Sequence, residues 1–238
     1  MEDKIQQFKQ LVNKCDNIVF FGGAGVSTES GIPDFRSKDG LYNQQYKYPP
    51  ETILSHTFFM NKTEEFFKFY KLKMNSLKYQ PNITHIKLSE LEARGKLKAV
   101  ITQNIDGLHQ KAGSKVVYEL HGSVLRNYCM NCHKFYDDEY VFNSNGIPRC
   151  SCGEIIKPDV VLYEEELKEE TIEKSIYAIQ NADLLIVAGT SLTVQPASGL
   201  INFFRGRNFV LINRDSTPYD NKANLVINDS LGKVFSKL

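Results

Sequence analysis

The sequence has no excess of charge of either sign. Lysine and arginine together number 29, aspartate and glutamate number 28, and the formal net charge at pH 7 is +1. A chain with this balance has no overall field that would draw it to nucleic acid or to an anionic membrane. Internal repeats, low-complexity tracts and Pro/Ser-rich linkers are also absent, which argues against a solenoid or a disordered chain. The function must therefore lie in local sites on a folded domain.

Long apolar runs are missing as well. No stretch approaches the roughly 20 apolar residues that cross a bilayer, and the longest candidates, such as Leu184–Ala188, have the length of a strand. The first residues carry apolar side chains at helical spacing, at Ile5, Phe8, Leu11 and Val12. This pattern differs from the continuous apolar core of a signal peptide. We therefore expect a cytoplasmic protein with no membrane partner.

Short apolar runs flanked by turn residues recur along the chain and predict buried strands. They span residues 17–22, 97–102, 116–120, 183–189, 208–213 and 224–228. Segments with helical apolar spacing lie between several of them, at residues 84–94, 167–182 and 196–204. Alternation of this kind is typical of a parallel sheet covered by helices on both faces. The predicted fold class is α/β, with a Rossmann-type doubly wound parallel sheet.

Cysteine is scarce, and four of the five cysteines lie close together in the sequence. In a cytoplasmic chain such a group favours metal ligation over a disulfide. Two residues separate Cys129 from Cys132, one separates Cys150 from Cys152, and 17 separate the pairs. This spacing suits tetrahedral zinc held by four thiolates, with His133 as an alternative ligand. Four thiolates complete the coordination shell, so we expect one structural zinc ion.

A nucleic-acid-binding zinc ribbon is the competing interpretation of the same cysteine pattern. Such a ribbon needs a basic face. Between the two cysteine pairs, the basic side chains Lys134 and Arg149 stand against the acidic side chains Asp137, Asp138 and Glu139. We therefore expect no direct nucleic-acid binding.

Two segments break the strand–helix alternation and predict a smaller domain beside the large one. We expect residues 35–81 to form a loop and a helical module, and residues 123–158 to form the zinc-binding module. The large domain would then consist of residues 1–34, 82–122 and 159–238. A cleft is expected between the two domains.

The first predicted strand runs into the glycine-rich turn Gly22-Gly23-Ala24-Gly25. Glycines let a backbone approach a pyrophosphate, and the N-terminus of the next helix would point its N–H groups at that anion. The dehydrogenase fingerprint needs Gly or Ala where Thr28 stands, and no second strand ends in an acidic residue about 20 positions further on. Hydride transfer is therefore disfavoured, and the glycines alone leave nucleotide binding and tight packing equally open.

Polar segments follow several predicted strands directly. They are Ser30–Ser37, Thr102–His109, Glu119–Ser123 and Gly189–Ala197. Because open parallel sheets bind ligands at the carboxyl ends of their strands, we expect these segments to share one rim of the sheet. An arbitrary histidine such as His121 is more often structural than catalytic, but an imidazole with a pKa near 6.5 can accept a proton at cytoplasmic pH.

Taken together, the motifs resemble those of the sirtuin family of NAD-dependent protein-lysine deacylases, of the bacterial type. They are GAGVSTESGIPDFRS, TQNIDGLHQKAG, the His121-Gly122 pair, the paired cysteines, GTSLTVQPA and LIN, in the family's order over nearly the whole chain. The resemblance implies a deacetylase that consumes NAD. The acyl-lysine oxygen would attack the ribose C1′, nicotinamide would leave, and the acyl group would move to the ribose 2′-hydroxyl.

The resemblance also implies roles for individual residues. His121 is the expected base, and Asn104 is expected to order the ribose and a water. Phe35 is expected to shield the ribose, and Arg36 to neutralise phosphate. Asp106 and the backbone of Ile105 are expected to hold the nicotinamide carboxamide. The other expected NAD contacts are Ala24, Thr28, Asp34, Gln103, Thr190, Ser191, Asn213 and Asp229.

The substrate is expected to be an acyl-lysine protein or peptide, with nicotinamide as a product inhibitor. The family pairs the peptide backbone as an added strand, and the corresponding residues here are Val160, Val161, Leu162 and Tyr163. Directly after them, the family's usual Phe-Gly-Glu reads Tyr-Glu-Glu in this chain.

The acyl preference is expected to be for neutral groups. Relatives that prefer succinyl or malonyl groups carry Tyr and Arg where our alignment places Phe67 and Tyr70. Two other functions stay open at this stage. One is mono-ADP-ribosyl transfer from the same activated ribose, and the other is a non-catalytic NAD sensor or zinc-dependent scaffold.

Overall fold

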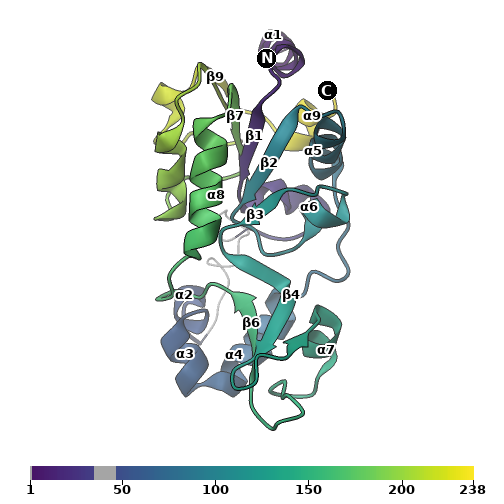
Figure 1. Ribbon diagram of the computed structural model, residues 1–238, viewed down its shortest axis with the longest axis vertical. Helices are drawn as coiled ribbons and strands as arrows, with labels where there is room; N and C mark the ends of the chain where they lie inside the picture. The colour runs from purple at the N-terminus through teal and green to yellow at the C-terminus, as the bar shows by residue number, and fades with distance from the viewer. Residues whose placement is uncertain (1, 35–46) are drawn as a thin grey trace.

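The large sheet consists of six parallel strands in the order β3-β2-β1-β7-β8-β9 (Figure 1). The computed structural model describes residues 2–34 and 47–238. The strands are β1 (Ile18–Gly22), β2 (Leu97–Thr102), β3 (Val117–Glu119), β7 (Leu184–Ala188), β8 (Asn208–Ile212) and β9 (Leu225–Ile227). The order reverses between β1 and β7, which creates the switch point where doubly wound sheets bind ligands. The predicted α/β fold class is confirmed.

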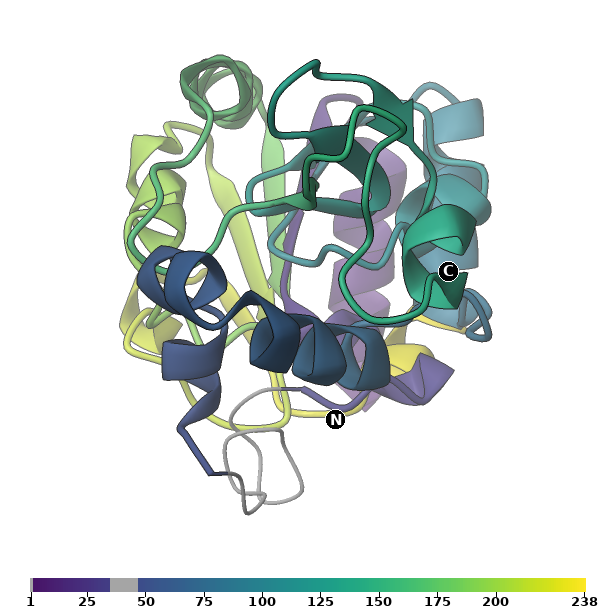
Figure 2. The same ribbon diagram turned by 90° about the horizontal axis from the view of Figure 1, so that it is seen from below.

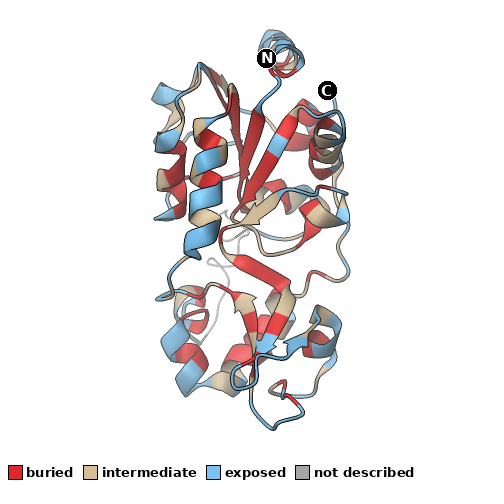
Figure 3. Ribbon diagram, viewed as in Figure 1, coloured by how far each residue is buried: buried red, intermediate tan, exposed pale blue. Residues whose placement is uncertain are grey.

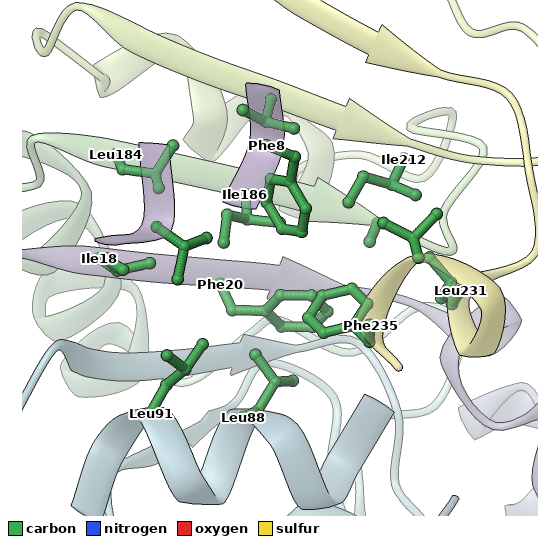
Figure 4. Packing of buried hydrophobic residues seen from close by; sticks show 14 of the residues in the cluster. Phe8, Ile18, Phe20, Leu88, Leu91, Leu184, Ile186, Ile212, Leu231 and Phe235 are labelled. Atoms are coloured by element: carbon green, nitrogen blue, oxygen red, sulfur yellow. The ribbon is translucent and has the colours of Figure 1, made fainter. Parts of the chain in front are cut away.

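Helices cover both faces of this sheet because successive strand residues point to opposite sides. Phe20 of β1 packs in one cluster with Phe8 and Phe235, and Figure 4 shows these rings meeting beside the sheet. The neighbouring Phe21 belongs to the cluster on the opposite face. The first face is covered by α1 (Glu2–Lys14), α5 (Ile83–Ala93) and α9 (Leu231–Phe235), and the second by α8 (Glu169–Gln180) and the 3-10 helix η4 (Ala197–Phe203).

Burial on both sides explains why the strands read as continuous apolar runs. All residues of β1 and β7 are buried, and Figure 3 shows these strands as the buried centre of the large sheet. The predicted helix at 196–204 is a 3-10 helix instead. It contains Ser198 and Gly199, which are poor helix formers. Within the described residues, no helix combines the length and apolar character needed to span a membrane.

A second, antiparallel sheet has the strand order β5-β4-β6. Its strands are β4 (Gly122–Cys129), β5 (Phe135–Tyr136) and β6 (Ile156–Val160). The helices α2 (Pro50–Ile53), α3 (His56–Asn61), α4 (Thr63–Lys73) and α7 (Asp138–Asn143) share one apolar cluster with it. Figure 2 shows this group seen from below. Edge-to-face and stacked rings of Phe59, Phe66, Phe67 and Tyr70 fill its centre, so the small sheet has a core of its own.

The remaining helices are single turns that follow strands. They are η1 (Ala24–Val26), η2 (Thr28–Ser30), α6 (Leu108–Lys111) and η5 (Asp220–Lys222). Two of these turns follow β1 and one follows β2, so they lie at the carboxyl edge of the large sheet. This edge is where the polar segments of the sequence come together.

Candidate active site

One cleft of about 590 Å³ brings the predicted residues together at the carboxyl edge of the large sheet. Residues from both sheets line it, for example Gln103 after β2 and Val160 in β6. The sequence-predicted residues in its wall are Ala24, Thr28, Asp34, Gln103, Asn104, Ile105, Asp106, His121, Val160, Val161, Leu162, Tyr163, Thr190, Ser191, Asn213 and Asp229. Phe35 and Arg36 lie outside the described residues.

The glycine-rich turn after β1 packs tightly against the turn after β7. A Cβ on Gly23 would lie 2.8 Å from the Cβ of Thr190, and a Cβ on Gly25 would lie 2.8 Å from the Cα of Gly189. The Gly25 N–H donates to the Gly189 carbonyl at 2.8 Å. The same turn lines the cleft through Ala24 and Gly25. Tight packing and ligand binding, which the glycines alone left as alternatives, are therefore compatible.

Amide side chains hold the ends of three strands at one rim. The Thr190 N–H donates to Oδ1 of Asn213, and Nδ2 of Asn213 donates to the Thr190 carbonyl, each at 3.0 Å. Nε2 of Gln103 donates to Oγ1 of Thr190 at 3.2 Å. Asp229, which also lines the cleft, accepts a 2.6 Å hydrogen bond from Lys233, and that bond lowers the pKa of Asp229. Polar groups of β2, β7 and β8 are thus fixed before any ligand binds.

Asp106 is a partly buried carboxyl group of the cleft, and three groups surround it. Ser27 Oγ donates to its Oδ2 at 2.6 Å, and the Leu108 N–H donates to its Oδ1 at 2.9 Å. Nδ2 of Asn104 donates to Ser27 Oγ at 3.0 Å. Burial raises the pKa of Asp106 and the charge of Glu119 adds to it, while these hydrogen bonds act in the opposite direction. The arrangement offers a carboxyl group that is rigidly oriented for a polar ligand group.

Ser27 was missed by the sequence analysis, although it lies in the wall of the cleft. It is 1% exposed and connects Asn104 to Asp106 through its hydroxyl group. Its position in the GAGVSTES segment was visible, but a serine between two expected contacts carries no separate signal. Only the folded chain brings it against the segment after β2.

His121 lies between β3 and β4, with one ring nitrogen already bonded. Its Nδ1 is 2.9 Å from the Gln103 carbonyl oxygen. Because a carbonyl oxygen can only accept, Nδ1 carries the proton, and the lone pair of the neutral ring is on Nε2. Burial lowers the pKa of His121, and the bond to Gln103 offsets part of this effect. The imidazole is therefore neutral at pH 7 and can accept a proton at Nε2.

The strand β6 reaches the cleft directly beside this histidine. The Val161 N–H donates to the His121 carbonyl at 2.9 Å. Gly122 pairs with Val160 in the antiparallel ladder and has a φ of 75°, in the left-handed region. A Cβ at Gly122 would collide with the Asp159 carbonyl oxygen. The expected base and the expected peptide-binding strand thus touch through their backbones.

The loop after β6 is fixed by hydrogen bonds to the helical module. The Tyr163 N–H donates to the Leu54 carbonyl at 2.9 Å, and the His56 N–H donates to the Tyr163 carbonyl at 3.0 Å. The Leu162 N–H donates to Oε2 of Glu165 at 2.9 Å. All three bonds lie in the wall that the substrate was expected to contact.

Glu164 stands where the family usually has glycine, and its backbone takes the conformation that glycine favours. Its φ is 76°, which costs a non-glycine residue on the order of 1–2 kcal/mol. Its carboxylate accepts a 2.9 Å hydrogen bond from the Thr57 N–H in the first turn of α3. Hydrogen bonds with the Thr57 side chain and with its backbone N–H lower the pKa of Glu164. The side chain therefore offsets the backbone strain by capping a helix.

The two aromatic positions of the acyl prediction are both buried. Phe67 is 1% exposed and Tyr70 is 0% exposed, and Tyr70 lines the cleft. The nearby Lys71 turns away, because its Nζ donates to the carbonyl and hydroxyl oxygens of Ser144 (2.7 Å each) and to the Gly146 carbonyl (2.6 Å). Lys71 is thus committed to the segment after α7.

Four cysteines form a separate cluster at the far side of the small sheet. The Sγ atoms of Cys129, Cys132, Cys150 and Cys152 all lie within 4.8 Å of one another. The Cys129–Cys152 and Cys132–Cys150 sulfurs are 3.4 and 3.5 Å apart, close to the roughly 3.8 Å edge of a tetrahedral zinc–thiolate centre. His133 is not part of the cluster. The donor set fits one zinc ion and leaves no coordination position for a reactant.

Comparison with known proteins identifies the family. The model of the Sir2 family matches residues 23–196, which is most of the chain. The chain belongs to the Sir2 family. The matched range contains Gly23–Gly25 of the glycine-rich turn and the four clustered cysteines.

Several curated relatives and solved structures match over almost their full length. The NAD-dependent protein deacetylase of Clostridium perfringens is 60% identical over 242 residues, covering 100% of this chain and 99% of that protein. The Clostridium acetobutylicum protein of the same name is 60% identical, covering 98% and 96%. A solved Sir2 enzyme superposes with a TM-score of 0.90 at 40% identity, covering 100% and 96%. A Sir2 complex with a p53 peptide and NAD+ superposes with a TM-score of 0.86 at 38% identity, covering 98% and 96%.

Proposed function

We propose that this chain is an NAD-dependent protein-lysine deacetylase. It transfers the acetyl group from lysine to ADP-ribose and releases nicotinamide, so that it is formally an acyl transferase. One observation carries the proposal. His121, whose Nε2 is left to accept a proton, lines the same cleft as the Asp106 carboxyl group and Val160 at the end of β6. Relatives named NAD-dependent protein deacetylase support it, as does a solved Sir2 complex with acetyl-ADP-ribose and deacetylated peptide.

The NAD side of the reaction requires oriented polar groups and a shielded ribose. NAD supplies the activated ribose that accepts the acyl group. Asp106, held by Ser27, and the backbone of Ile105 orient the nicotinamide carboxamide, while Asn104 orders the ribose. The other contacts are Ala24, Thr28, Asp34, Phe35, Arg36, Gln103, Thr190, Ser191, Asn213 and Asp229. His121 Nε2 takes the proton of a ribose hydroxyl, because Nδ1 is committed to the Gln103 carbonyl.

The peptide binds along Val160–Tyr163 as an added strand. Two of the N–H groups there are committed to backbone carbonyls, since Val161 donates to His121 and Tyr163 donates to Leu54. The Leu162 N–H instead donates to Oε2 of Glu165, a carboxylate that also contacts His56 and Lys157. A carbonyl of the bound peptide must displace this carboxylate to pair with Leu162. Backbone pairing of this kind binds an extended peptide with little selectivity for the side chains that flank the acyl-lysine.

The zinc ion has a structural role in this proposal. Its four thiolates connect β4 to the segment that leads into β6, and the Tyr136 hydroxyl donates to Cys150 Sγ at 3.2 Å.

We also propose that the chain has two domains. The large domain consists of residues 1–34, 82–122 and 159–238, and the small one of residues 35–81 and 123–158. We further propose that the product nicotinamide inhibits the enzyme, that the protein is cytoplasmic, and that it has no nucleic-acid partner.

The test is a product balance on an acetyl-lysine peptide. The purified protein with NAD should yield deacetylated peptide, nicotinamide and O-acetyl-ADP-ribose in equal amounts, and His121→Ala should yield none of them at a comparable rate. ADP-ribose bound to protein would favour the mono-ADP-ribosyltransferase instead. NAD binding without peptide-dependent turnover would favour the sensor or scaffold.

A further inference from the structure

The strand β4 contains an irregularity in its pairing with β6. Ser123 pairs with Asp159 and Asn127 pairs with Pro158, so residues 124–126 have no counterpart on β6. An insertion of this kind bends its strand and redirects side chains, and bulges are common beside functional sites. This one lies immediately after the His121-Gly122 turn.

The first two bulge residues contact the segment after β2. The Val124 N–H donates to the Ile105 carbonyl at 2.9 Å. The side chain of Leu125 fills the space beside Gly107, where a Cβ would lie 2.5 Å from Leu125 Cδ1. The bulge therefore supports the backbone on either side of Asp106.

The third bulge residue, Arg126, connects two carboxylates from different sheets. Its Nη1 donates to Oε2 of Glu119 at 2.7 Å, and its Nε donates to Oδ2 of Asp159 at 2.9 Å. The side chains of Glu119 and Asp159 are 7% and 13% exposed. Burial alone would lower the pKa of Arg126, but these two carboxylates outweigh it. Glu119 stands two residues before His121, and Asp159 directly precedes Val160.

We propose that Arg126 is a positioning residue of the deacetylase, which holds the His121 turn and the peptide-binding strand at a fixed separation. The inference rests on the proposed function. A guanidinium group suits this task because its planar fork can donate to two carboxylates in fixed directions, whereas an ammonium group cannot. The other polar partners of the network are Gln110, which donates to Glu119 at 2.8 Å, and Lys168, which donates to Asp159 at 2.7 Å.

Arg126 also balances a charge that acts on the nicotinamide side of the cleft. Burial raises the pKa of Asp106, and the negative charge of Glu119 adds to this rise. Removing Arg126 leaves the charge of Glu119 uncompensated. Positioning and charge balance can therefore be separated by a second substitution at Glu119.

The experiment compares Arg126→Met with three further variants on one acetyl-lysine peptide. Arg126→Met should raise KM for the peptide and lower kcat, so that kcat/KM falls between about 10- and 100-fold. The pKa of Asp106, followed by carbon-13 NMR, should rise in the same variant. Arg126→Lys should recover part of the loss in kcat/KM, and Arg126→Met/Glu119→Gln should lower the pKa of Asp106 again while the peptide KM stays high. Lys168→Met, which removes the exposed partner of Asp159, is the matched control and should change neither.

Several outcomes overturn the inference. Wild-type kcat, KM and Asp106 pKa in Arg126→Met would overturn it. A fall in kcat with an unchanged peptide KM would also overturn it, because such a fall indicates only that less enzyme is folded. If Arg126→Met does not fold, an Arg126→Lys enzyme with unchanged peptide KM overturns the inference in its place. An inactive wild type would instead refute the proposed function. In that case carbon-13 NMR titration of Asp106 still tests the charge balance, since its pKa should be higher in Arg126→Met than in the wild type.

Discussion

Replacing Gly122 by alanine places a methyl group between the expected base and the expected peptide strand. Gly122 has a φ of 75°. The new Cβ would collide with the Asp159 carbonyl oxygen and lie 2.9 Å from the carbonyl carbon of the same residue and 3.2 Å from the Val160 Cα. All these neighbours are backbone atoms, so no side chain can rotate away to relieve the contact.

Two effects add in this variant. The left-handed backbone costs a residue with a Cβ about 1–2 kcal/mol. Relief of the collision requires β6 to move away from His121 by on the order of 1 Å, the distance to ordinary van der Waals separation. A displacement of this size at a reacting group can lower the rate by about 10²-fold. Gly122→Ala should therefore lose both stability and turnover.

Gly95 provides the matched control. Its φ is 72°, and an added Cβ would meet no atom within 4 Å. Gly95→Ala should show the backbone cost alone in urea denaturation, with unchanged kcat/KM on an acetyl-lysine peptide. Equal stability losses in the two variants, or a Gly122→Ala enzyme within threefold of wild-type activity, would refute the reasoning from the close approach of β6.

Four other measurements test the catalytic histidine, the cysteine cluster, a buried histidine of α5 and the acyl preference. His121→Ala should lower the rate of deacetylation by at least about 10²–10⁴-fold. Because burial lowers the pKa of His121, the acidic limit of the wild-type kcat/KM profile should lie below pH 6.5. A limit above that value would contradict a buried neutral base. Cys150→Ala should lose zinc and far-UV dichroism together, so a folded, metal-free and active variant is the outcome that excludes a structural metal. Burial lowers the pKa of His85 to about 4, below its unfolded value of 6.5. The contribution of the neutral ring to the free energy of unfolding is therefore complete above pH 6.5, and as much as about 3 kcal/mol of it is lost as the pH falls to 4. His85→Gln should flatten this pH dependence of the denaturation midpoint. With Phe67 and Tyr70 at the positions of the Tyr and Arg of succinyl-preferring relatives, acetyl-lysine should give a higher kcat/KM than succinyl-lysine, and the opposite order would show that a cation reaches the acyl group.

The parallel sheet could be predicted because its signal is local. Each strand buried on both faces is a short apolar run between turn residues, and the predicted runs at 17–22 and 183–189 contain β1 and β7. The zinc cluster was visible for a similar reason, since two short cysteine spacings fix two pairs of ligands. Patterns of this kind depend on neighbours in sequence, so one sequence is sufficient to read them.

The contacts that cross between segments could not be predicted. Ser27 meets Asp106 across 79 residues, and Arg126 meets Asp159 across 33. Neither pair has a spacing that marks it, because the bulge of β4 and the turn after β1 decide which atoms come within reach. Glu164 combines both situations. The sequence showed that it stands where the family usually has glycine, but only the structure shows that its carboxylate accepts the Thr57 N–H at the start of α3.

The position of His121 explains why such long-range contacts collect around it. Only Leu120 and His121 separate β3, in the parallel sheet, from β4, in the antiparallel one. The His121 carbonyl accepts a hydrogen bond from the Val161 N–H, in the segment expected to bind the peptide. The His121 ring donates through Nδ1 to the carbonyl of Gln103, just after β2. A rotation of one sheet against the other would therefore strain the histidine from both sides. The close approach at Gly122 and the bridge through Arg126 act on the same joint, so both are expected to alter catalysis without touching a reacting atom.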